Sequence, residues 1–335
     1  MWRNPDSAGI RVVHSAGMSG IPFAHEMWFQ SGHRSLDWSF AVETATLLLL
    51  ASVLAVTVAV RLFSSRWNGV DVPVIGRLAP WMPFAVRIHL AVALVGLLSL
   101  GYYLSPDMDL QATVPGVLLG AVMAVVAVAM VTGYRVREAA LLLVAAGPLG
   151  MLEFGVAPVL QRIDMLGLAA FLLFAGAGRW SADEERGAVG AVDPAKAIWA
   201  LRVAAGSALI IVAFYEKLAN PQLALAFLAE HPEFNVSPFS DLEFLRMAGG
   251  VEVLFGLLVI SGALPQVAVL VAGVPFNLTL WFFGAHELMG HLPIYGAMLV
   301  LLVYGSDPVL RSATKDLWPF ERRRRTAVAT QPALT

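Results

Sequence analysis

The residues best suited to chemistry lie in the stretch 281–304, which reads WFFGAHELMGHLPIYGAMLVLLVY. Two apolar runs flank a polar segment that contains His286, Glu287 and His291. Imidazole and carboxylate groups bind copper, zinc or iron. The two histidines are five positions apart, about 140° around a helix, whereas the zinc-binding helix of metalloproteases needs a spacing of four. A metal site on one continuous helix is therefore disfavoured.

Two helix-breaking residues lie beside these side chains. Gly290 and Pro293 predict that one helix ends near Gly290 and that the next begins near Pro293, where proline is favoured in the first turn. In such a turn the imidazoles of His286 and His291 converge. The sequence thus keeps open a metal site built on a turn.

Other histidines are predicted to share the same side of the membrane. His231 follows a run rich in leucine and alanine, PQLALAFLAE, which predicts a short interfacial helix. His25 and His33 lie in the N-terminal tail. With His286 and His291, these residues form a candidate site for a transition metal or haem. The alternative is that they are interfacial polar residues that contact water, backbone or headgroups.

Glu252 lies near the middle of an apolar segment. A carboxylate at that depth costs several kcal/mol unless it is protonated or paired, so it must face protein. Arg202, Lys217 and Arg246 are possible partners, and helix depth favours Lys217 or Arg246. The pattern allows two roles, a buried interaction that fixes helix packing beside Gly249 and Gly250, or proton transfer and quinol contact.

The composition places these side chains in a membrane protein. The 335 residues are 58% hydrophobic and 14% charged, with a mean hydropathy of +0.73, whereas soluble domains are roughly 45–50% apolar and about 25% charged. A net charge of -2 gives no basic face for nucleic acid. The sequence contains no cysteine, which excludes disulfides, thiolate metal sites and a thiol relay in this chain.

We expect an all-α, polytopic membrane bundle of about nine transmembrane helices, with lipid as its main partner. The apolar segments are 40–60, 84–103, 114–131, 139–156, 165–176, 198–215, 247–264, 267–283 and 292–304.

Lysine and arginine placement predicts the orientation, because basic residues are retained on the cytoplasmic side. With the N-terminus outside and the C-terminus inside, most of the 22 basic residues fall on the inner side. The run 322–325 is then a topology anchor, and Arg87 and Arg202 mark the inner ends of their spans. We expect a multi-pass protein of the bacterial inner membrane.

The chain also repeats internally. A shift of 129 residues places Gly133, Gly155, Gly167 and Gly176 on four later glycines without a gap, and a shift of 115 places Arg87 on Arg202. Two parallel copies of a four-helix unit are predicted. The first copy carries Ala157, Pro158 and Arg162 where the second has the polar set, which predicts an asymmetric site and a scaffolding first half. The expected units are an outer tail (1–39), an extra helix (40–63), repeats (81–178 and 196–307) and a basic cytoplasmic tail (308–335).

The second copy resembles the DoxX/DoxD family of four-helix bacterial membrane proteins. The resemblance covers roughly residues 198–305 and is carried by LRVAAGSALIIVAFYEKLANP and FLRMAGGVEVLFGLLVISGALPQVAVLVAG. The family pattern falls on Arg202, Gly206, Glu216 and Lys217, and then on a membrane glutamate, Glu252, among glycines. The resemblance implies a redox-linked membrane protein, as in the membrane subunit of thiosulfate:quinone oxidoreductase. It makes Glu252, Glu216 and Lys217 the candidate catalytic residues.

Three functions remain open from the sequence. The preferred hypothesis is a DoxX-like membrane subunit of a redox, quinone-linked complex, which contacts a redox protein partner and is not catalytic alone. The second is an outer-face protein that binds copper, zinc, iron or haem through its histidines. The third is a structural membrane protein without a cofactor.

Overall fold

The structure is a computed structural model that describes residues 36–67, 70, 72–188, 190–235, 237–283 and 285–321. Within these ranges every regular element is a helix, and the one isolated bridge between extended residues joins Tyr102 and Asp109. The predicted all-α class is therefore confirmed for the described part of the chain.

The helices fall into an N-terminal element and two longer series. The first element is α2 (Thr44–Ser64). The first series is α3 (Pro73–Gly76), η1 (Ala79–Trp81), α4 (Met82–Ser99), α5 (Val114–Thr132), α6 (Val136–Phe154), α7 (Val156–Gln161), α8 (Ile163–Ala175) and α9 (Ala182–Glu185). The second series is α10 (Pro194–Val212), η2 (Ala213–Leu218), α11 (Pro221–Glu230), η3 (Pro232–Phe234), α12 (Asp241–Ser261), α13 (Pro265–Phe283), α14 (Ala285–Ser306), η4 (Ala313–Lys315) and η5 (Pro319–Glu321).

Among the described residues, five helices are long and apolar enough to cross a membrane. They are α2, η1 with α4, α5, α10 with η2, and α12. About 20 helical residues at 1.5 Å each cover the roughly 30 Å of a hydrocarbon core. Shorter apolar helices cover Ile163–Ala175, Pro265–Leu278 and Gly290–Ser306. By length and composition, the chain is a membrane protein with several candidate spans.

The nine predicted apolar segments all overlap helices, but the number of crossings stays a prediction. Helix α6 illustrates the difference. It carries Arg137, Glu138 and Glu153, and charged side chains in a span are costly unless they are paired or reach its ends. The predicted short helix after Asn220 is confirmed as α11.

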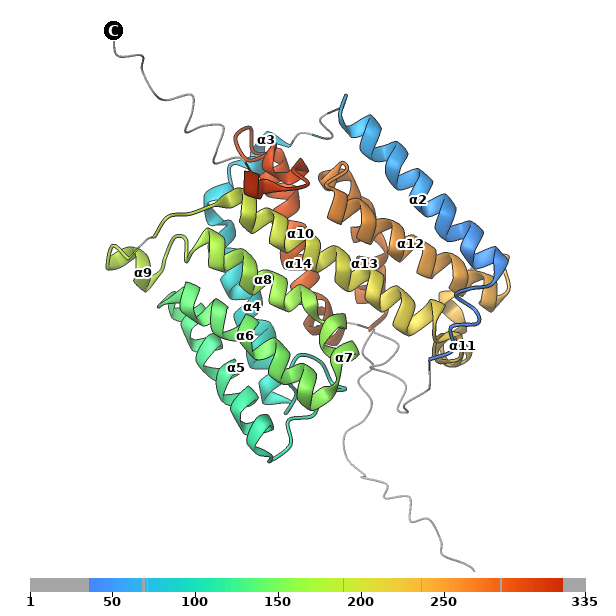
Figure 1. Cartoon of the computed structure of the whole chain (residues 1–335), viewed down its shortest axis with the longest axis horizontal. Coiled ribbons are helices and arrows are strands. Elements are labelled where there is room, and N and C mark those ends of the chain that lie inside the picture. The colour runs from blue at the N-terminus through green and yellow to red at the C-terminus, as the bar shows by residue number, and fades with distance from the viewer. Residues whose placement is uncertain are drawn as a thin grey trace, which may run out of the picture.

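Helix α2 covers one flank of the bundle and packs against α12 (Figure 1). Thr46 and Thr57 are buried, whereas Leu48 is 64% and Leu62 67% exposed. A surface of large apolar side chains is suited to lipid contact and not to water. The helix therefore has a protein-facing side and a side for the bilayer.

The two series interlock through their helices. Helix α10 runs between α8 of the first series and α12 of its own (Figure 1), and α14 of the second series packs against α4 of the first. Leu94, Phe171, Leu201 and Val300, from α4, α8, α10 and α14, belong to one buried apolar cluster. The two series thus share a core.

Arg87 fixes the end of α5 from inside the bundle. The side chain is fully buried and donates hydrogen bonds to the carbonyls of Met130 and Trp180, each at 2.9 Å. A cation is favourable at a helix C-terminus, where carbonyls lack helical partners. Helix α5 ends at Gly133 with φ 67°, and a Cβ there would lie 2.6 Å from Arg87 Nη1. Glycine satisfies both the backbone conformation and the close approach.

Arg202 does the same at the end of α12. It is fully buried and donates to the carbonyls of Ile260 at 3.0 Å and Asp316 at 2.8 Å. Gly262 ends α12 with φ 66°, and a Cβ there would lie 2.5 Å from Arg202 Nη1. Helices α5 and α12 therefore end in the same way, on a buried arginine and a left-handed glycine.

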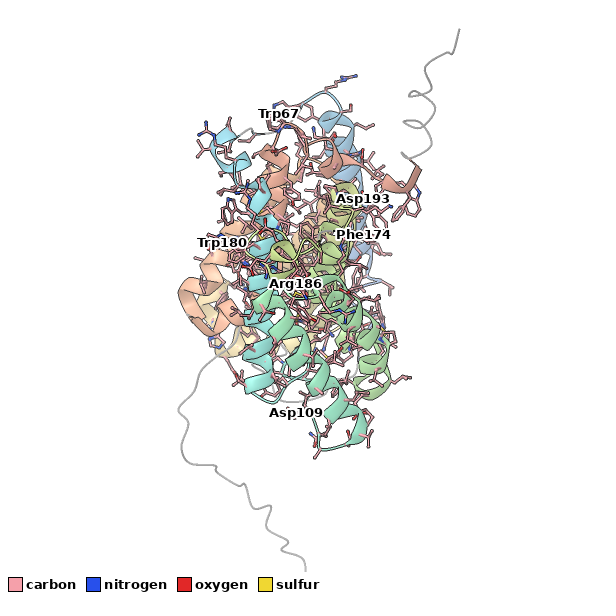
Figure 2. All side chains as sticks on the ribbon, turned by 90° about the vertical axis from the view of Figure 1, so that its left-hand side faces the viewer. Trp67, Asp109, Phe174, Trp180, Arg186 and Asp193 are labelled. Carbon is pink, nitrogen blue, oxygen red and sulfur yellow. The ribbon has the colours of Figure 1, made fainter. Side chains whose placement is uncertain are left out.

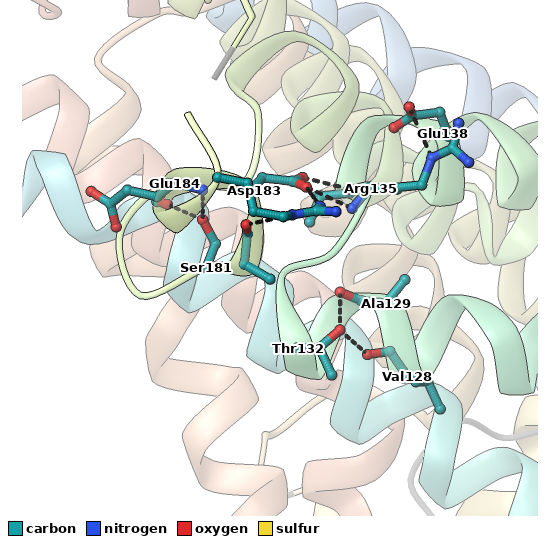
Figure 3. A network of polar contacts seen from close by, with 12 residues as sticks. Val128, Ala129, Thr132, Arg135, Glu138, Ser181, Asp183 and Glu184 are labelled. Atoms are coloured by element: carbon teal, nitrogen blue, oxygen red, sulfur yellow. Dashed lines mark hydrogen bonds and ion pairs between the residues drawn. The ribbon is translucent and has the colours of Figure 1, made fainter. Parts of the chain in front are cut away.

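A polar network at the α8–α10 connection holds the start of α6 (Figure 3). The Asp183 carboxylate accepts hydrogen bonds from the backbone N–H groups of Arg135 at 2.8 Å and Val136 at 3.0 Å. These N–H groups have no partner within their own helix, so a carboxylate from a distant loop stabilises the helix N-terminus.

The connections lie at two ends of the bundle. Trp67, which follows α2, and Asp109, between α4 and α5, lie at opposite ends of the molecule (Figure 2). This separation is what two connections on opposite sides of a bilayer require.

Helix α14 corrects the prediction that a helix ends at Gly290. It runs from Ala285 to Ser306 with Pro293 in its interior, and the preceding helix ends at Phe283. Proline removes one helical hydrogen bond, but neighbouring helices compensate for such losses in membrane proteins. Here Arg162 of the first series donates two hydrogen bonds to the carbonyl of Gly290, three residues before the proline, and so holds this part of α14 from outside. Packing therefore outweighs the local helix-breaking signal.

Candidate functional site

A cavity of about 490 Å³ lies among the helices of the second series. Its walls come from α10 with η2, from α11, α12, α13 and α14, and from the α7–α8 junction of the first series. Aromatic side chains supply much of the lining, including Phe227, Phe244, Phe255 and Phe276. The volume is within the range of pockets for small molecules, roughly 300–1,000 Å³.

An ion pair lies in the wall of this cavity. Lys217 Nζ lies 3.0 Å from Glu252 Oε1, and their side chains are 12% and 30% exposed. The structure thus confirms that Glu252 pairs with Lys217. Arg246, the other predicted partner, pairs instead with Glu43, the residue just before α2, at 2.6 Å. Removing one member of a partly buried pair leaves the other charge poorly solvated, so the two side chains stabilise each other.

The backbone around this pair is unusual. Lys217 and Glu216 lie in η2, a π-helical segment that continues α10. Single π-helical turns occur frequently at functional sites because they redirect side chains within a helix. Glu216 is 3% exposed and lines the same cavity. The three candidate catalytic residues are therefore brought to one cavity.

Small residues allow this part of α12 to pack closely. A Cβ at Gly249 would lie 2.8 Å from Leu218 of η2, and a Cβ at Gly250 would lie 2.7 Å from Leu49 of α2. Both contacts are tighter than a Cβ normally makes, so a larger residue at either position would force the leucine to move. The pair of glycines fixes α12 against η2 and α2, and with it the position of Glu252.

Of the predicted metal ligands, His291 is one that lines the cavity. Its side chain is 4% exposed, and its ring meets Phe276 edge to face with the centroids 4.7 Å apart. The side chains of His286 and Glu287, and residues His25 and His33, lie outside the described residues. Their predicted convergence on His291 stays a prediction.

His231 lies elsewhere and is absent from the cavity lining. Its Nδ1 lies 3.2 Å from Glu233 Oε1. Hydrogen bonds from the backbone N–H of Glu233 and then from His231 lower the pKa of the Glu233 carboxyl. Among the described residues, no group of three histidines and carboxylates could hold a metal ion. The metal hypothesis therefore rests on residues beyond the described part of the chain.

The first series contributes three polar side chains that the sequence analysis did not assign to the site. Gln161, Arg162 and Asp164 line the cavity and are at most 7% exposed. The first half is therefore more than the predicted scaffold. One sequence feature could have drawn attention to Arg162, since a shift of 129 residues places it on His291. That alignment does not say, however, that the Arg162 side chain points toward the second series.

Comparisons with known proteins found no match, whether with a family model, a curated protein or a solved structure.

The arrangement combines apolar walls with a few ionisable groups. Lysine and arginine donate hydrogen bonds to carbonyl or anionic oxygens, and carboxylates accept or release protons. A cavity of this kind suits an amphipathic molecule with oxygen acceptors on an otherwise apolar body.

Proposed function

We propose that the protein is a membrane subunit of a quinone-linked redox complex and that it binds a quinone in the cavity between α10, α12 and α14. The observation that carries the proposal is the Lys217–Glu252 pair in the wall of an aromatic-lined cavity. A quinone ring fits apolar and aromatic walls, and its two carbonyl oxygens need hydrogen-bond donors.

The ionisable groups add a second reason to prefer a quinone. Reduction of a quinone to a quinol takes up two protons as well as two electrons. Glu216 and Glu252 line the cavity and can exchange protons with such a ligand, whereas the electrons must come from a redox partner protein. The chain is thus a binding subunit that is not catalytic alone.

The fold provides support for the proposed repeat. Helices α6 and α13 have bounds that differ by the same 129 residues at both ends, and α5 and α12 end on equivalent glycines and buried arginines. We infer from this that the first series is a parallel copy of the second, and the resemblance of residues 198–305 is the reason to propose that the second series is a DoxX-like unit. Nine spans, with the N-terminus outside a bacterial inner membrane, complete the proposal.

Quinone content is the direct test. The protein should be purified in mild detergent, extracted with organic solvent and analysed for quinone, and the depleted protein titrated with a short-chain quinone. We expect Lys217→Met to weaken binding by about 10-fold or more, because a hydrogen bond from a charged donor contributes about 1.5–3 kcal/mol. Glu252→Gln should leave Lys217 without its counter-charge and change the pH dependence of binding.

Lys196→Met is the matched control. Lys196 lies on α10, the helix that η2 continues, and pairs with a carboxylate, Asp193, at 3.0 Å, but neither residue lines the cavity. The control should bind quinone as the unaltered protein does. Protein that contains no extractable quinone and shows no saturable quinone binding would overturn the proposal. Elemental analysis and an optical spectrum of the same preparation test the metal and haem alternative.

A further inference from the structure

Arg162 reaches the cavity from the other half of the molecule. It lies at the junction of α7 and α8 with φ -106° and ψ 23°, a sparsely populated backbone region in which many active-site residues are found. Its side chain is 5% exposed and lines the cavity. A buried guanidinium in a membrane protein requires acceptors, so its hydrogen bonds decide what it can do.

Few of those hydrogen bonds are made. Arginine has five N–H donors. Nη1 and Nη2 each donate at 3.2 Å to one acceptor, the Gly290 carbonyl, and these are the only hydrogen bonds of Arg162 within the described residues. In the same part of the chain, Nε has no hydrogen-bond partner. Several donors therefore remain for another group.

Asp164 does not satisfy this guanidinium. Its Oδ1 lies 4.0 Å from Arg162 Nε, beyond hydrogen-bond distance, and this oxygen has no hydrogen-bond partner among the described residues. Asp164 is itself 5% exposed and lines the cavity. The carboxylate therefore lies near the guanidinium without occupying its donors.

The contrast with the other buried arginines is informative. Arg87 and Arg202 each donate to three backbone carbonyls, and neither lines the cavity. Their Nη groups hold helix ends, and only Nε of each has no hydrogen-bond partner among the described residues. Arg162, by comparison, has one carbonyl partner and a place in the cavity wall, which is the arrangement of a ligand-binding arginine.

We propose that Arg162 is a ligand-binding residue contributed by the first half, whose guanidinium donates to a carbonyl oxygen of the quinone bound in the second half. The inference rests on the proposed function. It assigns Arg162 as the donor to one carbonyl oxygen of the quinone and Lys217, on a different wall of the cavity, as the donor to the other. The cavity is then a composite site that neither half forms alone.

Infrared difference spectroscopy of bound quinone tests this role directly. A short-chain quinone labelled with ¹³C at one carbonyl allows each C=O stretch to be followed, and a hydrogen bond from arginine lowers the stretching frequency. Arg162→Met should weaken binding by about 10-fold and return one carbonyl band toward its position in detergent. Asp164→Asn should shift the same band further down, because it removes the competing charge on the guanidinium. Arg135→Met, an exposed arginine of the same half, is the control for the loss of a charge.

The outcomes separate this inference from the proposed function. Suppose that Arg162→Met changes neither quinone binding nor the two carbonyl bands, whereas Lys217→Met weakens binding. That result would overturn the role of Arg162 and leave the proposed function standing. No quinone binding by the unaltered protein would overturn both. If Arg162→Met does not fold, Asp164→Asn decides, since an unmoved carbonyl band in that variant contradicts the proposal.

Discussion

The two helix series differ in what they enclose at positions that the proposed repeat would make equivalent. The shifts of 115 and 129 residues place Lys217 on Tyr102 and Glu252 on Met123. Met123 is fully buried in the main apolar cluster, whereas Glu252 lines a cavity. A bundle of membrane helices can therefore enclose either a packed core or a binding cavity, and a few side chains that face the interior decide between the two.

A loop completes the packing of the first series. Tyr103, from the α4–α5 connection, is fully buried, and its ring stacks on Phe154 with the centroids 5.8 Å apart. Gly150 of α6 makes room for it, since a Cβ there would lie 2.5 Å from Tyr103 Cε1. In the second series the corresponding connection is longer and contains α11, whose Phe227 and Leu228 line the cavity.

The largest expected loss of stability comes from truncating a buried side chain in the first helix series. Tyr103→Ala removes a buried aromatic ring and should lower the free energy of unfolding by about 3–5 kcal/mol. Phe255→Ala, in the cavity wall of the second half, should lower it by less than about 2 kcal/mol, because its ring already borders open space. Thermal or denaturant unfolding in detergent measures both. Equal losses would contradict the contrast between a packed and an open half.

The shared helix ends should respond alike in the two halves. Gly133→Ala and Gly262→Ala add a Cβ in a left-handed conformation and against a buried guanidinium, so each should destabilise by about 2–3 kcal/mol. Gly187→Ala is the matched control, since Gly187 has φ 63° and nothing within 4 Å of the added Cβ. It should lose only about 1–2 kcal/mol, the backbone cost alone. If Gly187→Ala lowers the free energy of unfolding as much as the other two substitutions do, the contact with the buried arginine does not contribute to the loss.

The ion pair of the second half should show energetic coupling. In a double-mutant cycle of Lys217→Met and Glu252→Gln, we expect each single change to destabilise and the double variant to recover part of the loss, with a coupling of about 1–2 kcal/mol. The same cycle at Lys196 and Asp193, a local i,i+3 pair whose lysine is more exposed than Lys217, should give about 0.3–0.5 kcal/mol. Similar coupling in both cycles would mean that the cavity does not strengthen the pair.

The smallest effect on stability is expected from a test of orientation. The absence of native cysteine permits single-cysteine labelling at exposed positions in the connections. An impermeant maleimide should label Ala112→Cys and Ala229→Cys in intact cells, and Ala188→Cys only after permeabilisation, if the halves are parallel with the N-terminus outside. Labelling of Ala112→Cys and Ala229→Cys from opposite sides would exclude parallel halves.

The sequence by itself determined the class of the protein and most of its helices, because long apolar runs and their polar interruptions reflect local transfer into lipid. It also determined that Glu252 must face protein and be protonated or paired, since an isolated charge cannot remain in such a run. The short helix α11 follows from local pattern as well.

Only the tertiary structure decided where the polar groups meet. The continuity of α14 through Pro293 depends on contacts with neighbouring helices, and local helix propensity predicts a break. The arrival of Arg162 in the cavity depends on how α7 and α8 lie against α10 and α14, a relation between residues 128 positions apart along the chain. Hydropathy is a property of each segment, whereas the choice between Lys217 and Arg246 as the partner of Glu252 is made by packing.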